Sequence, residues 1–437
     1  MSSFETLPAG CKRKSPFAFT AKVCLHFKPV SNEPPLMDNA KPILEPLPYH
    51  RDLRDYLKTQ ERELWDWFAS AKAKEQYTEN LRLGLLKTTY RLDPENHSDL
   101  YRAAAEARDR LQLNIPITIY QAQESHQSNA AIFYIPGEGH VVFFGPLLSL
   151  LNPEEMKSVI GHELAHYHLW QCEGGEFLIA DRLLQTMAED PHAAASHVQS
   201  ARHYQLYTEI FCDRGSLRVT NSLNAVVAGI VKLQTGLPQV SAASYLKQAE
   251  EIFQKSNVKT EELSHPEAFI RARALALWAE GQPDAAKHIS DMIEGAAELD
   301  GLDLPGQARL TELTRRLLEN FLRPKWFQTQ TVLGHAKLFF ENFRSAKDSD
   351  PTLIEQLKFS DPKLRDYLCY LLLDFVVADP ELDEVPLAAA LQLAQTLEID
   401  TAFEKCVTKE LKIKARDLKR LKDQATELLA KAETEAP

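Results

Sequence analysis

The chain has 437 residues, an ordinary globular composition and a formal net charge of −12 at pH 7. Its length predicts two or three domains with enough apolar residues for hydrophobic cores. The negative charge argues against a nucleic-acid-binding surface and against attraction to anionic lipids. No run of 18 or more apolar residues is present, so the sequence predicts no membrane span.

Two features bear on the cellular location. Residues 1–45 contain six prolines and little hydrophobic periodicity, which predicts an irregular lead-in without the long apolar stretch of a secretory signal. The six cysteines of the chain are scattered, with no close pair and no metal-binding spacing. We therefore expect reduced thiols in a cytoplasmic protein.

Helical periodicity begins at Asp52, where leucine and aromatic residues recur at spacings of three and four. Two further helices are predicted over 81–90 and 99–111. Short runs rich in β-branched and aromatic residues then predict three strands of a small sheet, over 116–120, 131–135 and 141–144. We expect helices packed around this sheet.

The segment from His162 to His166 reads H-E-x-x-H, the spacing of a zinc-dependent peptidase helix. Positions four apart lie on one face of an α-helix, so both imidazoles can bind one metal ion. Glu163 lies beside them and can act as a general base toward water activated by the metal. Asn152 and Pro153 form a typical helix start before the motif. The structural alternative is two histidines held by hydrogen bonds inside a core.

A catalytic zinc site takes three protein ligands and leaves a fourth position for water. Glu209 and Asp213 share a helix face through their i, i+4 spacing. Glu209 can therefore bind the metal while Asp213 accepts the other ring N–H of a ligating histidine. A solvated acidic face, or an ion pair of Asp213 with a nearby arginine, stays open as the alternative. Other candidates for the third ligand are Glu173, Glu176, Glu189, His192, His197 and His203.

Three separated segments make the chain resemble the gluzincin metallopeptidases, a family that includes the heat-shock protease HtpX, the mitochondrial Oma-type proteases and the type I CAAX prenyl proteases. The segments read V-x-x-H-E-x-x-H over 159–166, E-x-x-x-D-R over 209–214 and H-P-x-x-x-x-R over 265–271. The resemblance covers about residues 95 to 280. It implies a mainly α (α+β), zincin-like fold with a small β-sheet and an active-site helix. It also implies one zinc ion per chain, bound by His162, His166 and Glu209.

The chain departs from this family in two respects. Family members of bacterial and organellar membranes carry transmembrane helices around the site, and this sequence predicts none. Cys212 stands where the family usually has a small residue such as alanine. We interpret Cys212 as a small buried hydrophobic residue.

The resemblance also implies roles for residues around the metal. His265 is a candidate catalytic residue that donates to the oxyanion of the tetrahedral intermediate, with Tyr204 and Tyr207 as alternatives. Asp213 and Arg271 are expected to support the metal ligands. The predicted substrate strand is an exposed edge to which an extended polypeptide adds by main-chain hydrogen bonds, and it comprises Val141, Val142, Phe143 and Phe144.

The last third of the chain is predicted to be all helical. Its clearest helices are predicted over 364–377, 385–397 and 401–411. The stretch 370–384 resembles the helical TerB-like fold, with Pro380 where that family has glycine. The acidic residues of this stretch can bind a divalent cation, although such a cluster more often caps a helix start: Asp374, Asp379, Asp383 and Glu384.

The sequence thus predicts an irregular lead-in over 1–45, a zinc metallopeptidase domain over 46–290, linking helices over 291–345 and a TerB-like helical domain over 346–437. We expect a zinc metalloendopeptidase that acts on unfolded or extended polypeptides and has no nucleic-acid partner. The alternative is a catalytically silent or latent metal-binding adaptor. In that case the C-terminal domain binds the peptidase domain or another protein.

Overall fold

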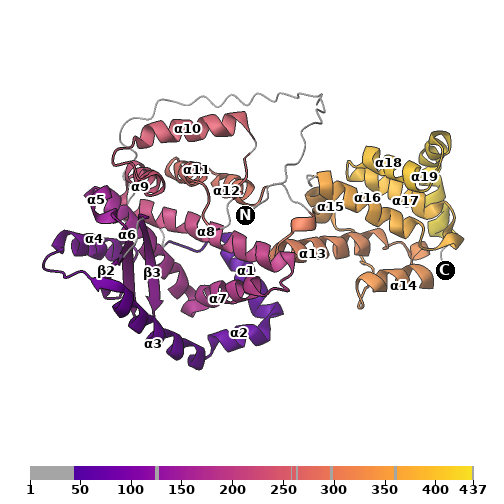
Figure 1. Cartoon of the computed structure of the whole chain (residues 1–437). Coiled ribbons are helices and arrows are strands. Elements are labelled where there is room, and N and C mark those ends of the chain that lie inside the picture. The colour runs from indigo at the N-terminus through magenta and orange to yellow at the C-terminus, as the bar shows by residue number, and fades with distance from the viewer. Residues whose placement is uncertain are drawn as a thin grey trace, which may run out of the picture. The chain divides into compact units, whose positions relative to one another are not determined.

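The computed structural model describes residues 44–123, 127–256, 258–261, 264–295, 299–358 and 362–435. The predicted lead-in therefore lies almost wholly outside the described residues. The described chain is mostly helical and has a small four-stranded sheet (Figure 1), which confirms the predicted fold class. Within these ranges, none of the helices combines the length and the apolar character that crossing a membrane requires.

The first four helices are α1 (Pro48–Gln60), α2 (Arg62–Ala69), α3 (Ala71–Thr88) and α4 (Ser98–Arg110). Of these four helices, α3 packs against β1 (Thr89–Arg91) and α4 packs against β2 (Ile117–Ala122). In α1, Leu53 and Leu57 are both fully buried because residues four apart share one face. The predicted helix over 81–90 is the end of α3, which starts earlier than the apolar pattern indicates.

The sheet has the strand order β1-β2-β4-β3. Its strands are β1 (Thr89–Arg91), β2 (Ile117–Ala122), β3 (Asn129–Ile135) and β4 (Glu138–Phe144). β4 pairs in parallel with β2 and antiparallel with β3. Gly137, with a φ of 80°, makes the tight turn between β3 and β4, a conformation that glycine adopts without steric cost. The three predicted strands are confirmed, and β1 is too short to show a periodic pattern.

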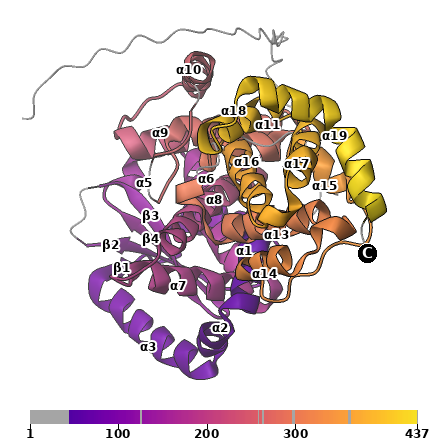
Figure 2. The ribbon, with the colours of Figure 1, turned by 90° about the vertical axis from the view of Figure 1, so that its right-hand side faces the viewer.

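The prediction that Val141 to Phe144 form an exposed edge strand is wrong. They belong to β4, which has a hydrogen-bonded strand on each side (Figure 2), so its main-chain groups are engaged inside the sheet. Val141, Val142 and Phe143 are at most 1% exposed. An extended substrate cannot add to such a strand, and β3 is the edge next to β4.

The next helices follow the sheet in the chain. They are α5 (Leu147–Leu150), α6 (Pro153–Gln171), α7 (Glu176–Glu189), α8 (Ala195–Thr220), α9 (Leu223–Thr235), α10 (Ala242–Lys255), α11 (Ala268–Ala279) and α12 (Ala285–Ile293), with a 3-10 turn at Cys172–Gly175. Helix α6 carries the H-E-x-x-H motif and packs against α4, α8, α9 and β3. The motif is therefore central to this region.

Helix α6 starts where the sequence predicts. The Asn152 side chain accepts the N–H groups of Glu154 and Glu155, and the Glu155 carboxylate accepts the Asn152 N–H. Close packing between α6 and α8 depends on small residues, because a Cβ added to Gly215 would lie 2.4 Å from the Cβ of Ala165. This close approach brings the carboxylates of α8 to the motif.

The C-terminal part is all helical, as predicted. Its helices are α13 (Leu304–Phe321), α14 (Gln330–Phe339), α15 (Pro351–Lys358), α16 (Pro362–Val376), α17 (Val385–Thr396), α18 (Asp400–Glu410) and α19 (Ala415–Glu435). They share a hydrophobic cluster that begins at Leu317, in the second half of α13. The start of α13 belongs to another cluster, because Leu304 packs with residues of α1 and α8.

Three of the acidic residues predicted as cation candidates have protein partners. Asp374 lies 2.9 Å from the His335 Nε2, and Glu384 accepts from Arg420 at 2.7 Å. Asp379 accepts a hydrogen bond from the Thr329 hydroxyl at 2.6 Å and caps the turn that follows it. These contacts favour structural roles for the acidic stretch.

Candidate metal centre

Helix α6 brings the three motif residues to one cavity of about 310 Å³. The rings of His162 and His166 lie one helical turn apart, with centroids separated by 5.0 Å. Both imidazoles are mostly buried, and Glu163 is 6% exposed. The three motif side chains therefore line one cavity.

Glu209, on α8, lies between the two histidines. Its Oε2 is 3.2 Å from the Nε2 of His162, and its Oε1 is 3.4 Å from the Nε2 of His166. Two ligands of a tetrahedral zinc ion with bonds of about 2.0–2.1 Å are about 3.3 Å apart. The buried Oε2 has no aligned hydrogen-bond donor, although a ring nitrogen is so near. Two imidazoles and one carboxylate that converge in this way fit a zinc ion.

Asp213, one turn after Glu209, orients His162. Its Oδ1 lies 3.1 Å from the Nδ1 of His162, and Arg271 donates to its two oxygens at 2.7 and 2.6 Å. Burial would raise the pKa of Asp213, but the Arg271 guanidinium holds this pKa below its ordinary value. An ionised Asp213 accepts the Nδ1–H of His162 and leaves its Nε2 free for a metal.

The cluster has the electrostatics of a cation site. Burial alone would lower the pKa of His162, but the carboxylates of Glu209 and Asp213 raise it to about 10. Burial would also raise the pKa of Glu209, yet the two histidines hold it well below its ordinary value. A centre that attracts a proton so strongly also attracts a divalent cation. Burial raises the pKa of Glu163 above its ordinary value.

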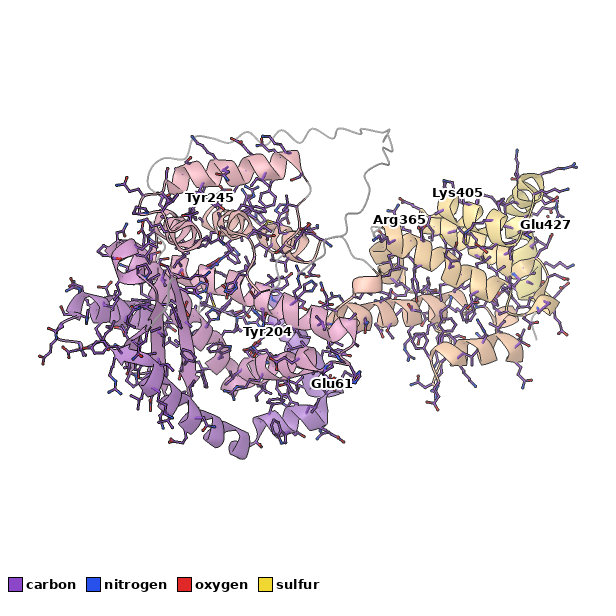
Figure 3. All side chains as sticks on the ribbon, in the orientation of Figure 1. Glu61, Tyr204, Tyr245, Arg365, Lys405 and Glu427 are labelled. Carbon is purple, nitrogen blue, oxygen red and sulfur yellow. The ribbon has the colours of Figure 1, made fainter. Side chains whose placement is uncertain are left out.

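His265 also reaches this cavity. Its side chain is 58% exposed, and its Nε2 lies 3.6 Å from Oε1 of Glu209. The alternative donors are engaged elsewhere: Tyr204 (Figure 3) donates to a main-chain carbonyl of α7, and Tyr207 donates to Glu294. His265 is therefore the better placed of the three candidates.

The other candidate ligands lie away from the two motif histidines. Glu173 and Glu176 both accept from Arg54, and His203 pairs with Asp303 at 2.9 Å. Glu189, His192 and His197 do not line the cavity. Among the candidates named from the sequence, the structure brings Glu209 to the motif histidines.

Two further surfaces contribute to the cavity lining. One is the edge strand β3, through the residues from Asn129 to Ile132. The other is apolar and comprises Val159 of α6 with Val226, Ile230 and Leu233. An extended main chain and an apolar side chain can thus both be placed beside the histidines.

Comparison with known proteins identifies the region around α6. The model of peptidase family M48 matches residues 93–171. This part of the chain is therefore similar to peptidase family M48. A curated relative, the plastoglobule-localized metallopeptidase 48, chloroplastic, of Arabidopsis thaliana, is 29% identical over 200 residues. The matched region covers 41% of this chain and 57% of the relative. No solved structure matches the chain.

The matched family is a family of peptidases, and the relative is by its name a metallopeptidase. The matched segment ends at Gln171, so it includes the motif but not the carboxylates of α8. The contacts of Glu209, Asp213 and Arg271 with one another and with His162 and His166 therefore lie partly outside the matched segment.

One residue near the motif histidines was not predicted to lie there. The ligand atoms of Cys212, His162 and His166 all lie within 4.8 Å of one another. Cys212 is fully buried, and burial raises the pKa of its thiol well above the ordinary value. Its position three residues after Glu209, on the same face of α8, is the sequence signal that could have indicated it.

Proposed function

We propose that the chain is a zinc-dependent metalloendopeptidase that hydrolyses peptide bonds of extended or unfolded polypeptides. The observation that carries this proposal is the convergence of His162, His166 and Glu209 on one cavity that also contains Glu163. A closed structural metal site has four protein ligands and no use for a carboxylate that is not a ligand. The presence of Glu163 beside two histidines favours catalysis.

The proposed zinc ligands are His162, His166 and Glu209. When bound there, zinc lowers the pKa of a water to about 7 and polarises the carbonyl of the scissile bond. Asp213 fixes the ring of His162 through the Nδ1 hydrogen bond, and Arg271 keeps Asp213 ionised and in place. These two residues are positioning residues.

The proposed proton transfers use two other side chains. Glu163 takes the proton of the attacking water and passes it to the leaving amine. His265, which is exposed to the cavity, donates a hydrogen bond to the developing oxyanion. Each group then stabilises charge that develops only during the reaction.

We propose β3, not β4, as the strand that aligns the substrate. Its residues from Asn129 to Ile132 line the cavity, and β3 is an edge of the sheet. Main-chain hydrogen bonds to an edge strand are largely independent of the side chains of the peptide. This supports extended polypeptides of varied sequence as substrates.

The test compares the full-length wild type with Glu163→Gln and with Glu154→Gln, which changes an exposed glutamate on the same helix. Zinc content and cleavage of casein are measured for each. We expect one zinc ion in all three proteins and a loss of cleavage of at least about 100-fold for Glu163→Gln alone. Equal cleavage by all three would remove Glu163 as the base. One zinc ion in a wild type that cuts no unfolded protein would favour the adaptor alternative.

We also propose that the C-terminal helices form a separate unit that regulates the peptidase or binds a partner protein. The hydrophobic cluster from Leu317 to Ala425, which begins in the second half of α13, supports this unit. The limits over 46–290, 291–345 and 346–437 and the TerB-like resemblance stay predictions. The cytoplasmic location also stays a prediction.

A further inference from the structure

The two motif histidines are held in place in different ways. The Nδ1 of His162 lies 3.1 Å from the Oδ1 of Asp213, so a hydrogen bond fixes its ring. The Nδ1 of His166 is buried and has no hydrogen-bond partner among the residues that the structure describes. A metal-binding histidine normally donates its second ring N–H to a carboxylate, a carbonyl or water, which sets the orientation of the ring. The orientation of His166 therefore depends on packing against its ring rather than on a protein acceptor.

Trp170 supplies such packing. It lies one turn after His166 on α6, and the two ring centroids are 5.5 Å apart with an interplanar angle of 32°. Trp170 is partly buried and lines the same cavity as the two motif histidines. The indole thus packs against the ring of His166 and limits the rotation of that ring.

Trp170 also contacts the edge strand of the sheet. Tyr134 on β3 packs against the indole at nearly a right angle, with ring centroids 6.1 Å apart and an interplanar angle of 87°. Strand β3 lies beside α6 (Figure 1), and Tyr134 follows the segment from Asn129 to Ile132 that lines the cavity. Trp170 therefore connects β3 with a motif histidine.

We propose that Trp170 is a positioning residue of the metal centre, which orients His166 and links it to the strand that aligns the substrate. The inference rests on the proposed function, in which His166 is a metal ligand and β3 aligns the polypeptide. Three observations carry it: the packing of Trp170 on His166, the unpartnered Nδ1 of His166 and the contact of Trp170 with Tyr134. Zinc affinity then depends on the indole, although Trp170 is not itself a ligand.

Asp181 of α7 is the competing candidate for this role. Burial raises the pKa of its carboxyl to about 6, while the hydrogen bond from Gln185 and the charge of the nearby His166 act in the opposite direction. The carboxylate of Asp181 is therefore close to His166. It accepts a hydrogen bond from Gln185 at 3.0 Å, however, and none from the Nδ1 of His166. The experiment compares the two residues directly.

The test measures zinc affinity of the full-length protein by competition with a chelator, so it does not depend on activity. We expect Trp170→Leu to bind zinc at least about tenfold more weakly than the wild type. Trp170→Phe keeps an aromatic ring beside His166 and should stay within about threefold of the wild type. Tyr134→Leu removes the contact from the strand and should weaken zinc binding by about two- to tenfold. Asp181→Asn should change zinc affinity less than Trp170→Leu does.

The matched control is Trp65→Leu. Trp65 is 5% exposed, packs with α1 and α7, and does not line the cavity. Its replacement should lower the melting temperature but leave zinc affinity unchanged, which separates a general loss of stability from an effect on the metal centre.

A second measurement serves if Trp170→Leu does not fold. Co²⁺ bound at the centre quenches the emission of tryptophan at short range, and the chain has five tryptophans. One equivalent of Co²⁺ should quench part of the emission of the wild type, and Trp170→Phe should lose most of that quenching. A wild type without quenching would place Trp170 away from the metal and overturn the inference.

The outcomes separate this inference from the proposed function. Equal zinc affinity in the wild type and Trp170→Leu overturns the inference, and a loss in Asp181→Asn alone would assign the role to Asp181. Unchanged zinc affinity in Tyr134→Leu would remove the link to β3. Casein cleavage by a zinc-loaded wild type whose zinc affinity does not depend on Trp170 would refute this inference alone. Zinc affinity that depends on Trp170, without any cleavage, would refute the proposed function alone.

Discussion

Arg271 holds the carboxylate of Asp213, which in turn orients the ring of His162. It donates two hydrogen bonds to Asp213, which is 1% exposed and holds His162. Arg271→Ala leaves this buried carboxylate without its cation, at a cost of about 3–5 kcal/mol in the free energy of unfolding. We expect zinc affinity, measured by competition with a chelator, to fall by about 10- to 100-fold.

The matched control for this prediction is Arg273→Ala. Arg273 lies on the same helix but pairs with Glu250, away from the cavity. Zinc affinity should therefore change little in Arg273→Ala. Equal zinc affinity in the two variants would show that Arg271 does not act through the metal ligands.

His162 makes the metal-free protein sensitive to alkali. Its pKa in the folded protein is about 10, above the ordinary value of about 6.5, so its protonated form stabilises the folded state. That stabilisation is complete below about pH 6.5 and is lost as the pH rises toward 10. We expect the free energy of unfolding in urea of the metal-free protein to fall between about pH 6 and pH 9.

Zinc reverses the sign of this dependence. A bound ion needs a neutral imidazole, so acid displaces the ion and the zinc-bound protein loses stability and activity as the pH falls. Asp213→Asn removes a carboxylate that raises the pKa of His162, and it should flatten the alkaline dependence of the metal-free protein. An unfolding free energy of the metal-free wild type that is constant between about pH 6 and pH 9 would contradict this account.

Sequence spacing predicts the side chains that one helix presents together. The positions of His162 and His166, and of Glu209 and Asp213, follow from the helical repeat alone. Cys212 was missed because a buried cysteine is usually a small apolar residue, and only the partner helix places a sulfur near imidazoles. The meeting of α6 and α8 depends on Gly215, whose importance is visible only in the packed structure.

At the scale of elements, the sequence predicts which segments form strands but not the order of these strands in the sheet. The apolar runs predict β2, β3 and β4, because each strand is a local pattern. The pairing of β4 with both β2 and β3 is a non-local choice, and it removes Val141 to Phe144 from the edge. Likewise Pro305 and Gly306 suggest a break, yet they open α13, because proline is tolerated in the first turn and Asp303 caps it.

The edge position of β3 predicts how substrates respond to changes in their main chain. A peptide that adds to β3 uses its own N–H groups, so N-methylation of an amide two or three residues from the scissile bond removes one hydrogen bond. We expect kcat/KM to fall about two- to tenfold relative to the parent peptide. Side-chain changes at the same position should matter less. An unchanged kcat/KM for every N-methylated peptide would exclude alignment on an edge strand.

At the scale of the whole molecule, helix α13 belongs to two hydrophobic clusters: its start packs with α1 and α8, and its second half packs with the later helices. Asp303 is 4% exposed and accepts from the Tyr49 hydroxyl at 2.7 Å, and its other neighbour is His203 at 2.9 Å. The N–H of Leu304 donates to Ser200. These contacts join segments that are far apart in the sequence, so periodicity could not predict that the start of α13 packs with α1 and α8.

This arrangement predicts where the chain can be shortened. A chain that ends at residue 302 lacks Asp303 and Leu304, whereas one that ends at residue 312 keeps both, and neither contains the cluster that begins at Leu317. Without Asp303, the buried Tyr49 hydroxyl and His203 lose a shared acceptor, so we expect the shorter chain to melt several degrees lower by circular dichroism. Asp303→Ala in the full chain should shift the peptidase transition in the same direction. Equal melting temperatures for the two truncations would place the end of the peptidase core before α13.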